Sequence, residues 1–201
     1  MKTLVLWRHG RTSWNAAGRA QGHADIPLDE TGHTQALAAA SRLAELPPAA
    51  IWTSDLGRTV ETAGYLERAT GLVAVLDKRL REYDMGERQG LTIPEATERY
   101  GSGVITELDL QERRIVPGAE ITADVRERLN PALEEMLASL DPGGAGVVVT
   151  HGAALKVGLA GLLGWPVDQA QSLRGIDNCG WAIVTESGSG QRRLAAYNRV
   201  A

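Results

Sequence analysis

The sequence contains no phenylalanine, a single cysteine, no long run of basic residues and no long uninterrupted hydrophobic stretch. One cysteine excludes an intramolecular disulfide and is typical of a reducing compartment, so we expect a cytoplasmic protein. A formal net charge of -4 without a basic run argues against nucleic acid or an anionic membrane as the main partner. The apolar N-terminal stretch stops at Arg8, too early for a signal-peptide core. The later apolar region is broken by His151 and Lys156, which excludes a bilayer span.

What is present is an ordinary globular composition, with 43% hydrophobic and 23% charged residues in 201. No linker rich in serine, proline and glycine divides the chain, so we expect one domain over residues 1–201. The regular pattern weakens at about 83–123, around a short helix predicted at 93–100. We expect this segment to form a small lid.

Short apolar runs alternate with helical patterns along the chain. Strands are predicted at 3–7, 50–53, 72–76 and 146–150, and two more are expected around the Gly/Ser turn near the C-terminus as an antiparallel edge hairpin. Helices are predicted at 31–46 with Thr31 as N-cap, at 56–70 ending at Gly71, and at 121–140 with a kink or break at Pro131. This order predicts an α/β three-layer sandwich, with a mainly parallel central sheet and helices on both faces.

Charged and proton-transferring residues follow three of these strands. RHG follows the first strand, TSDLGR the second, and THG the strand with the VVV centre. Ligands of parallel sheets bind beyond the carboxyl ends of the strands. The sequence therefore offers Arg8, His9, Arg58 and His151 to one crevice.

These residue types suit a phosphate monoester, an anion with several strong acceptor oxygens. The planar guanidinium groups of Arg8 and Arg58 supply pairs of N–H donors that match phosphate oxygens. His9, followed by a glycine that allows close backbone approach, is the candidate nucleophile, and His151 is the candidate clamp for the charge on the phosphoryl oxygens. Glu82, predicted just after a strand, is the candidate proton donor. The alternative for Glu82 is a surface carboxylate that pairs with Arg79 or Arg81.

Six motifs in this order, RHGRTSWN, QGHADIPLDETG, TSDLGRTVETA, LREYDMGERQG, PGAE and VVVTHG, resemble the histidine phosphatase superfamily over essentially the whole chain. The resemblance implies that His9 becomes phosphorylated, that Arg8, Arg58 and His151 complete the phosphate pocket, and that Glu82 is the acid and base. It also implies substrate contacts by Asn15, Gln21, Gly22 and Gly152, and no metal or cofactor. Arg11 and the PGAEI segment depart from the usual family pattern.

Three functions are compatible with this resemblance. The EYDMG segment and the modest lid favour a phosphatase branch that acts on a small-molecule phosphate monoester, with glucosyl-3-phosphoglycerate or another sugar or glycerate phosphate as candidate substrate. A cofactor-dependent phosphoglycerate mutase is the first alternative, and it would need a site that excludes water. A non-enzymatic scaffold that binds phosphorylated ligands is the second. A homodimer is one option for the assembly.

Overall fold

One six-stranded sheet runs through the computed structural model, which describes residues 1–101 and 116–201, in the order β3-β2-β4-β1-β5-β6. The strands are β1 (Lys2–Arg8), β2 (Ala50–Thr53), β3 (Val75–Leu76), β4 (Ala145–Thr150), β5 (Trp181–Glu186) and β6 (Arg192–Arg199). The first four pair in parallel, whereas β5 and β6 form an antiparallel hairpin at one edge. The mainly parallel sheet and its edge hairpin are therefore confirmed.

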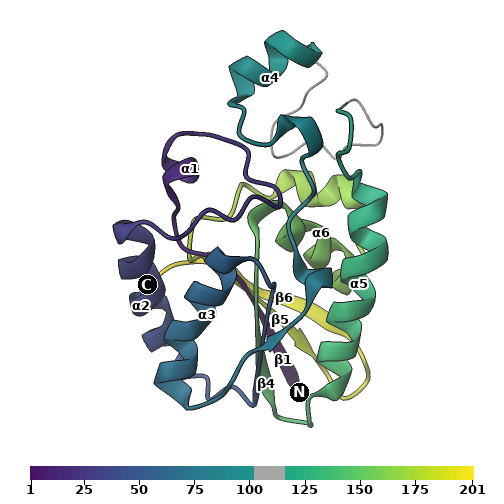
Figure 1. Ribbon diagram of the computed structural model, residues 1–201. Helices are drawn as coiled ribbons and strands as arrows, with labels where there is room; N and C mark the ends of the chain where they lie inside the picture. The colour runs from purple at the N-terminus through teal and green to yellow at the C-terminus, as the bar shows by residue number, and fades with distance from the viewer. Residues whose placement is uncertain (102–115) are drawn as a thin grey trace.

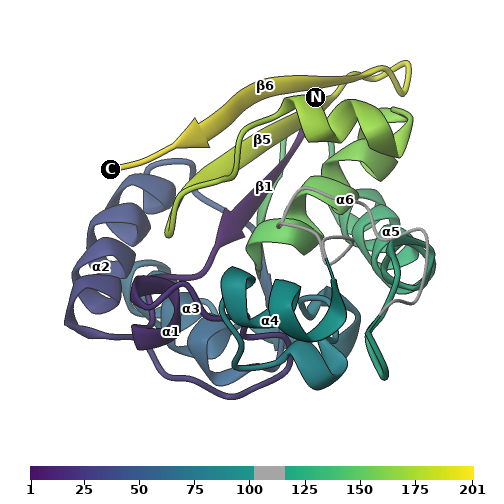
Figure 2. The ribbon, with the colours of Figure 1, turned by 90° about the horizontal axis from the view of Figure 1, so that it is seen from above.

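Helices cover both faces of the sheet (Figures 1 and 2). On one side lie α2 (Glu30–Ala44) and α3 (Gly57–Thr70), and on the other lie α5 (Thr122–Ser139) and α6 (Gly152–Leu163). Alternate residues of β1 serve the two layers, because successive side chains of a strand point to opposite faces. Leu4 and Leu6 join the core beneath α5 and α6, while Val5 and Trp7 join the core beneath α2 and α3.

The shorter helices are α1 (Ser13–Ala16), η1 (Lys78–Leu80), η2 (Gly86–Arg88), α4 (Ile93–Tyr100) and η3 (Val167–Ser172). Figure 1 shows α1 and α4 at the end of the molecule toward which the parallel strands run. The predicted lid falls partly on 102–115, outside the described residues. Within the described part of the chain, no helix is long and apolar enough to cross a bilayer.

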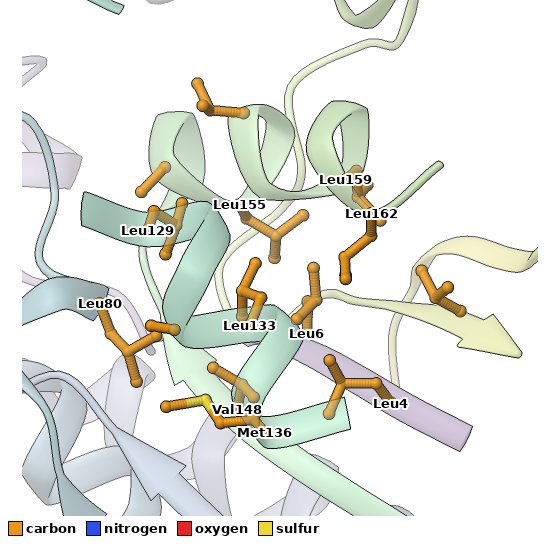
Figure 3. Close-up of a cluster of buried hydrophobic side chains, with 14 of the residues drawn as sticks. Leu4, Leu6, Leu80, Leu129, Leu133, Met136, Val148, Leu155, Leu159 and Leu162 are labelled. Atoms are coloured by element: carbon orange, nitrogen blue, oxygen red, sulfur yellow. The ribbon is translucent and has the colours of Figure 1, made fainter. Parts of the chain in front are cut away.

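The core between the sheet and the helices α5 and α6 is built largely from leucines (Figure 3). Glycines let the two helices approach closely. A β-carbon at Gly158 would lie 2.6 Å from Leu133 Cδ1, and one at Gly161 would lie 2.4 Å from Asn130 Nδ2. Leu133 therefore packs against Gly158 of α6, and it belongs to the same core as Leu4 and Leu6 of β1.

Three local predictions need correction. Asp29, not Thr31, caps α2, since its carboxylate accepts from the amide of Gly32 and the helix begins at Glu30. Strand β3 is only two residues long, and the predicted strand residues 72–74 lie outside it. Helix α5 continues through Pro131 without a break. Proline removes one backbone hydrogen bond there, and the buried residues on both sides hold the helix together.

Replacing Leu133 with alanine tests the core between α5 and α6. Its side chain is 1% exposed, so Leu133→Ala should lower the free energy of unfolding by about 2–5 kcal/mol in urea denaturation. Leu37→Ala, on the exposed face of α2, is the matched control and should cost less than about 1 kcal/mol. Equal losses in the two variants would contradict the assignment of this core.

Candidate active site

The three strand ends with charged residues lie next to one another in the sheet. Arg8 at the end of β1 is in register with Thr150 at the end of β4, and the amide of His9 donates to the carbonyl of Thr150. On the other side of β4, the amide of Ser54 donates to the carbonyl of Val149. The backbone ladder therefore delivers His9, His151 and the turn leading to Arg58 to one edge of the sheet, as the strand order requires.

His9 is 3% exposed, and its ring orientation is fixed by the main chain. Its Nδ1 lies 2.7 Å from the carbonyl oxygen of Gly10. A carbonyl only accepts, so Nδ1 carries the proton and Nε2 of the neutral ring holds the lone pair. Burial, and then the charges of Arg58 and Arg8, lower the pKa of His9 well below its ordinary value. The imidazole is thus neutral near pH 7, which is the form that can attack phosphorus.

Gly10 allows this arrangement through close backbone approach. A β-carbon at residue 10 would lie 2.6 Å from the carbonyl oxygen of Gly32, which is main chain and cannot swing away. The amide of Gly10 donates to Thr62 Oγ1 on α3. The turn after β1 is therefore held from two sides, which confirms the predicted use of this glycine.

Arg58 is a fully buried cation, with 0% of its surface exposed. Its guanidinium donates to the carbonyls of Ala24 and Gly22. Arg8 donates to the carbonyl of Ile176. Neither arginine forms an ion pair with a carboxylate among the described residues, and both Nε groups are buried without an acceptor. Burial lowers the pKa of Arg58 to about 10, so the group is still charged at neutral pH.

His151 lies behind Arg58 rather than on the wall of the cleft. Arg58 Nη2 lies 3.1 Å from Nδ1 of His151, and Nε2 lies 3.0 Å from Ser54 Oγ. A guanidinium only donates, so Nδ1 is the acceptor and Nε2 carries the proton. Burial, then Arg58 and His9, lower the pKa of His151. In this geometry His151 orients Arg58, and Ser54, which the sequence analysis did not single out, orients His151.

Glu82 sits at the N-terminus of α6. Its carboxylate accepts from the amides of Ala153 at 3.1 Å and Ala154 at 2.9 Å, where the helix presents unpaired donors. The helix η1 separates Glu82 from β3, so Glu82 does not directly follow a strand as predicted. The surface alternative does not hold, because Arg79 pairs with Asp77 and Glu135, and Arg81 pairs with Asp55.

The predicted substrate-contacting residues surround the same space. Asn15 Oδ1 accepts hydrogen bonds from Thr12 and from Asn178 Nδ2. The oxygen of the Asn15 amide is therefore held by the protein, and its Nδ2 is the atom that can donate to a ligand. Gln21 accepts from Thr12 Oγ1. Gly22 has φ 54° and leaves no room for a β-carbon beside Met85. A β-carbon at Gly152 would lie 3.2 Å from Arg8 Nε.

These groups line a cleft of about 330 Å³. Arg8, His9, Arg58, Glu82, Asn15, Gln21, Gly22 and Gly152 all border it, and so do residues that sequence reasoning missed, namely Trp14, Arg19, Met85, Arg88 and Ile93. Arg11 is not among them. It donates to Asp29 and Thr31 and ties the turn after β1 to α2. Within the described ranges, no group of three or more His, Cys, Asp or Glu side chains could hold a metal ion.

Comparisons with known proteins agree with this geometry. Residues 4–199 match the model of the histidine phosphatase superfamily (branch 1). A probable phosphoglycerate mutase GpmB of Cronobacter sakazakii is 40% identical over 89% of this chain and 82% of its own. A glucosyl-3-phosphoglycerate phosphatase of Mycolicibacterium vanbaalenii is 37% identical over 90% of this chain and 83% of its own.

Solved structures give the same picture. A mycobacterial glucosyl-3-phosphoglycerate phosphatase, in complex with VO3, superimposes with a TM-score of 0.90 at 36% identity, over 98% of this chain and 99% of its own. A structure named mycobacterial hydrolase 1 gives a TM-score of 0.91 at 36% identity, over 99% of both chains. Nearly the whole chain therefore shares its fold with a hydrolase and with a glucosyl-3-phosphoglycerate phosphatase.

The two buried histidines make stability sensitive to acid. The unfolded chain protonates at the ordinary pKa of 6.5, whereas the folded chain resists protonation, so the free energy of unfolding should fall as pH drops below about 6.5. Each buried histidine contributes up to about 1.4 kcal/mol per pH unit. In urea denaturation between pH 7 and 5, His9→Asn should show a shallower slope than wild type. His33→Asn, at a partly exposed histidine outside the site, controls for loss of an imidazole, and a wild-type slope in His9→Asn would contradict the assignment.

Proposed function

Because this chain belongs to the histidine phosphatase superfamily, we propose that it hydrolyses a small-molecule phosphate monoester through a phosphohistidine at His9, without metal or cofactor. The observation that carries the proposal is a neutral imidazole beside the buried Arg58 and the partly buried Arg8, neither of which forms an ion pair with a carboxylate among the described residues. Such a site offers cationic donors for a bound anion and a lone pair beside them. Cys179 is a buried free thiol, compatible with the reducing cytoplasm as the compartment.

In the first step, the substrate phosphoryl group binds between Arg8 and Arg58, with Asn15 Nδ2 as a further donor. The Nε2 lone pair of His9 forms a bond to phosphorus, and the bond from phosphorus to the ester oxygen breaks. The electron pair of that bond stays on the leaving oxygen, which takes a proton from Glu82. His151 holds Arg58 in place while charge spreads over the phosphoryl oxygens.

In the second step, water attacks the phosphohistidine and gives its proton to the Glu82 carboxylate. The bond from nitrogen to phosphorus breaks, its electron pair returns to Nε2, and inorganic phosphate leaves. Throughout, Nδ1 of His9 keeps its hydrogen bond to Gly10, so the ring does not rotate between the two steps. Glu82 acts as acid and then as base, which regenerates the starting protonation state.

Glucosyl-3-phosphoglycerate is the candidate substrate within the phosphatase branch. Two mycobacterial neighbours with over a third of their residues identical carry that activity in their names, and one was solved with VO3. The cleft is also lined by the apolar side chains of Trp14, Met85 and Ile93, and its volume of about 330 Å³ leaves room for a leaving group larger than a simple alcohol. The Cronobacter relative favours phosphoglycerate mutase as a second candidate.

Phosphate release from para-nitrophenyl phosphate, measured with excess EDTA, tests the proposal. Wild type should turn over with and without EDTA, and His9→Ala should fall to roughly a thousandth of wild type or below. His33→Ala, at a histidine outside the cleft, should keep wild-type activity. Inhibition by EDTA, or full activity of His9→Ala, would contradict the metal-free phosphohistidine mechanism.

The same preparation separates the two candidate functions. The phosphatase should release inorganic phosphate from glucosyl-3-phosphoglycerate with a higher kcat/KM than from 3-phosphoglycerate. A mutase would instead convert 3-phosphoglycerate to 2-phosphoglycerate, stimulated by the bisphosphate, with little free phosphate. Rapid isomer formation without phosphate release would favour the mutase.

A further inference from the structure

The segment that carries Glu82 has no regular secondary structure between η1 and Met85. One side chain of α5 forms several hydrogen bonds to its main chain. Arg128, on α5, donates from Nη1 to the carbonyls of Arg79 at 2.9 Å and Arg81 at 2.8 Å, and from Nη2 to the carbonyl of Glu82 at 2.8 Å. Three carbonyls in four consecutive residues therefore converge on one guanidinium.

Glu120 completes this arrangement from the PGAE segment. Its carboxylate accepts from Nε and Nη2 of Arg128, both at 2.8 Å, in a bidentate pair. It also accepts from the amide of Asp84 at 2.8 Å, and the amide of Glu120 donates to the carbonyl of Asp84 at 2.9 Å. Arg128 and Glu120 together therefore form hydrogen bonds to the main chain on both sides of Glu82. Burial opposes ionisation of Glu120, but the hydrogen bonds from Arg128 and from Asp84 bring its pKa below the ordinary value.

The other end of Glu82 is held separately. Its carboxylate accepts from two amides of α6, while its carbonyl is held by Arg128 of α5 and lies 2.9 Å from His23 Nε2. Backbone and side chain are thus fixed by different helices. Rigid fixation at both ends suits a group that must meet a leaving oxygen, because a displacement of about 1 Å can cost about 100-fold in rate.

We infer that Arg128, with Glu120, is a positioning residue for the proton transfer by Glu82, and that this is the role of the PGAE segment. The inference rests on the proposed function, since it assigns Arg128 a part in the same reaction. Arg128 does not border the cleft, so it acts through the Glu82 segment and not on the substrate.

Leaving-group dependence tests this role. Para-nitrophenolate leaves readily without a proton, whereas phenolate, from the unsubstituted ester, depends more on the acid. Arg128→Met should lower kcat/KM for phenyl phosphate by about 10-fold to 100-fold and for para-nitrophenyl phosphate by less than about 3-fold. The ratio kcat/KM is used because it reports the transition state of the steps up to phosphoryl transfer. Glu82→Gln should show the same pattern more strongly.

Arg126→Met is the matched control, because Arg126 is exposed on the same helix two residues away. It should leave both esters unchanged. Arg128→Lys keeps the positive charge beside Glu120 but fewer donors, so it should fall between wild type and Arg128→Met. In the double variant Glu82→Gln with Arg128→Met, the phenyl phosphate loss should exceed that of Glu82→Gln by less than about 2-fold, as expected when one residue acts through the other.

The possible failures are distinguishable. If wild type hydrolyses neither ester, the proposed function itself is wrong. If wild type is active and folded Arg128→Met loses the same factor on both esters, the positioning role is overturned in favour of general destabilisation. Should Arg128→Met not fold, Arg128→Lys and Glu120→Gln carry the same test, and an unchanged ratio of the two esters in both overturns the inference.

Discussion

The burial of Arg58 without a carboxylate beside it is the constraint on which the rest of the site depends. A buried charge is strongly unfavourable unless its hydrogen bonds are satisfied, and here main-chain carbonyls and one neutral imidazole provide the acceptors. A carboxylate partner would satisfy Arg58 better but would compete with an incoming anion. Both histidines are neutral as well, because burial first and then the charge of Arg58 lower their pKa.

The sheet makes this unfavourable cluster possible. Strands β1, β2 and β4 are adjacent and parallel, so their ends meet. Two apolar cores, one on each face of the sheet, offset the cost of gathering the polar groups there. The helix α6 contributes twice, because its first turn supplies amides to Glu82 and its glycines let α5 pack closely. Packing on α5 therefore bears on the cleft through Arg128, which links a core helix to the acid segment.

The sequence predicted what local pattern and motif order can encode. The parallel sheet, the edge hairpin, the use of Gly10 and the gathering of Arg8, His9, Arg58 and His151 followed from short apolar runs and from the residues after them. The cap of α2 was misplaced because Asp29 and Thr31 are both good caps and only the contact with Gly32 distinguishes them. Ser54, Asn178 and Arg128 were missed as parts of the site, since each acts through a contact with a residue distant in sequence.

The orienting partner of His9 is the carbonyl oxygen of Gly10, an atom of the main chain. In sites where an aspartate orients the histidine, one substitution abolishes the orientation. Here every amino acid at position 10 would carry a main-chain carbonyl oxygen. No substitution therefore removes the partner that sets the tautomer of the nucleophile, and only a displacement of the turn disturbs it, for example by a side chain at residue 10 that would contact Gly32.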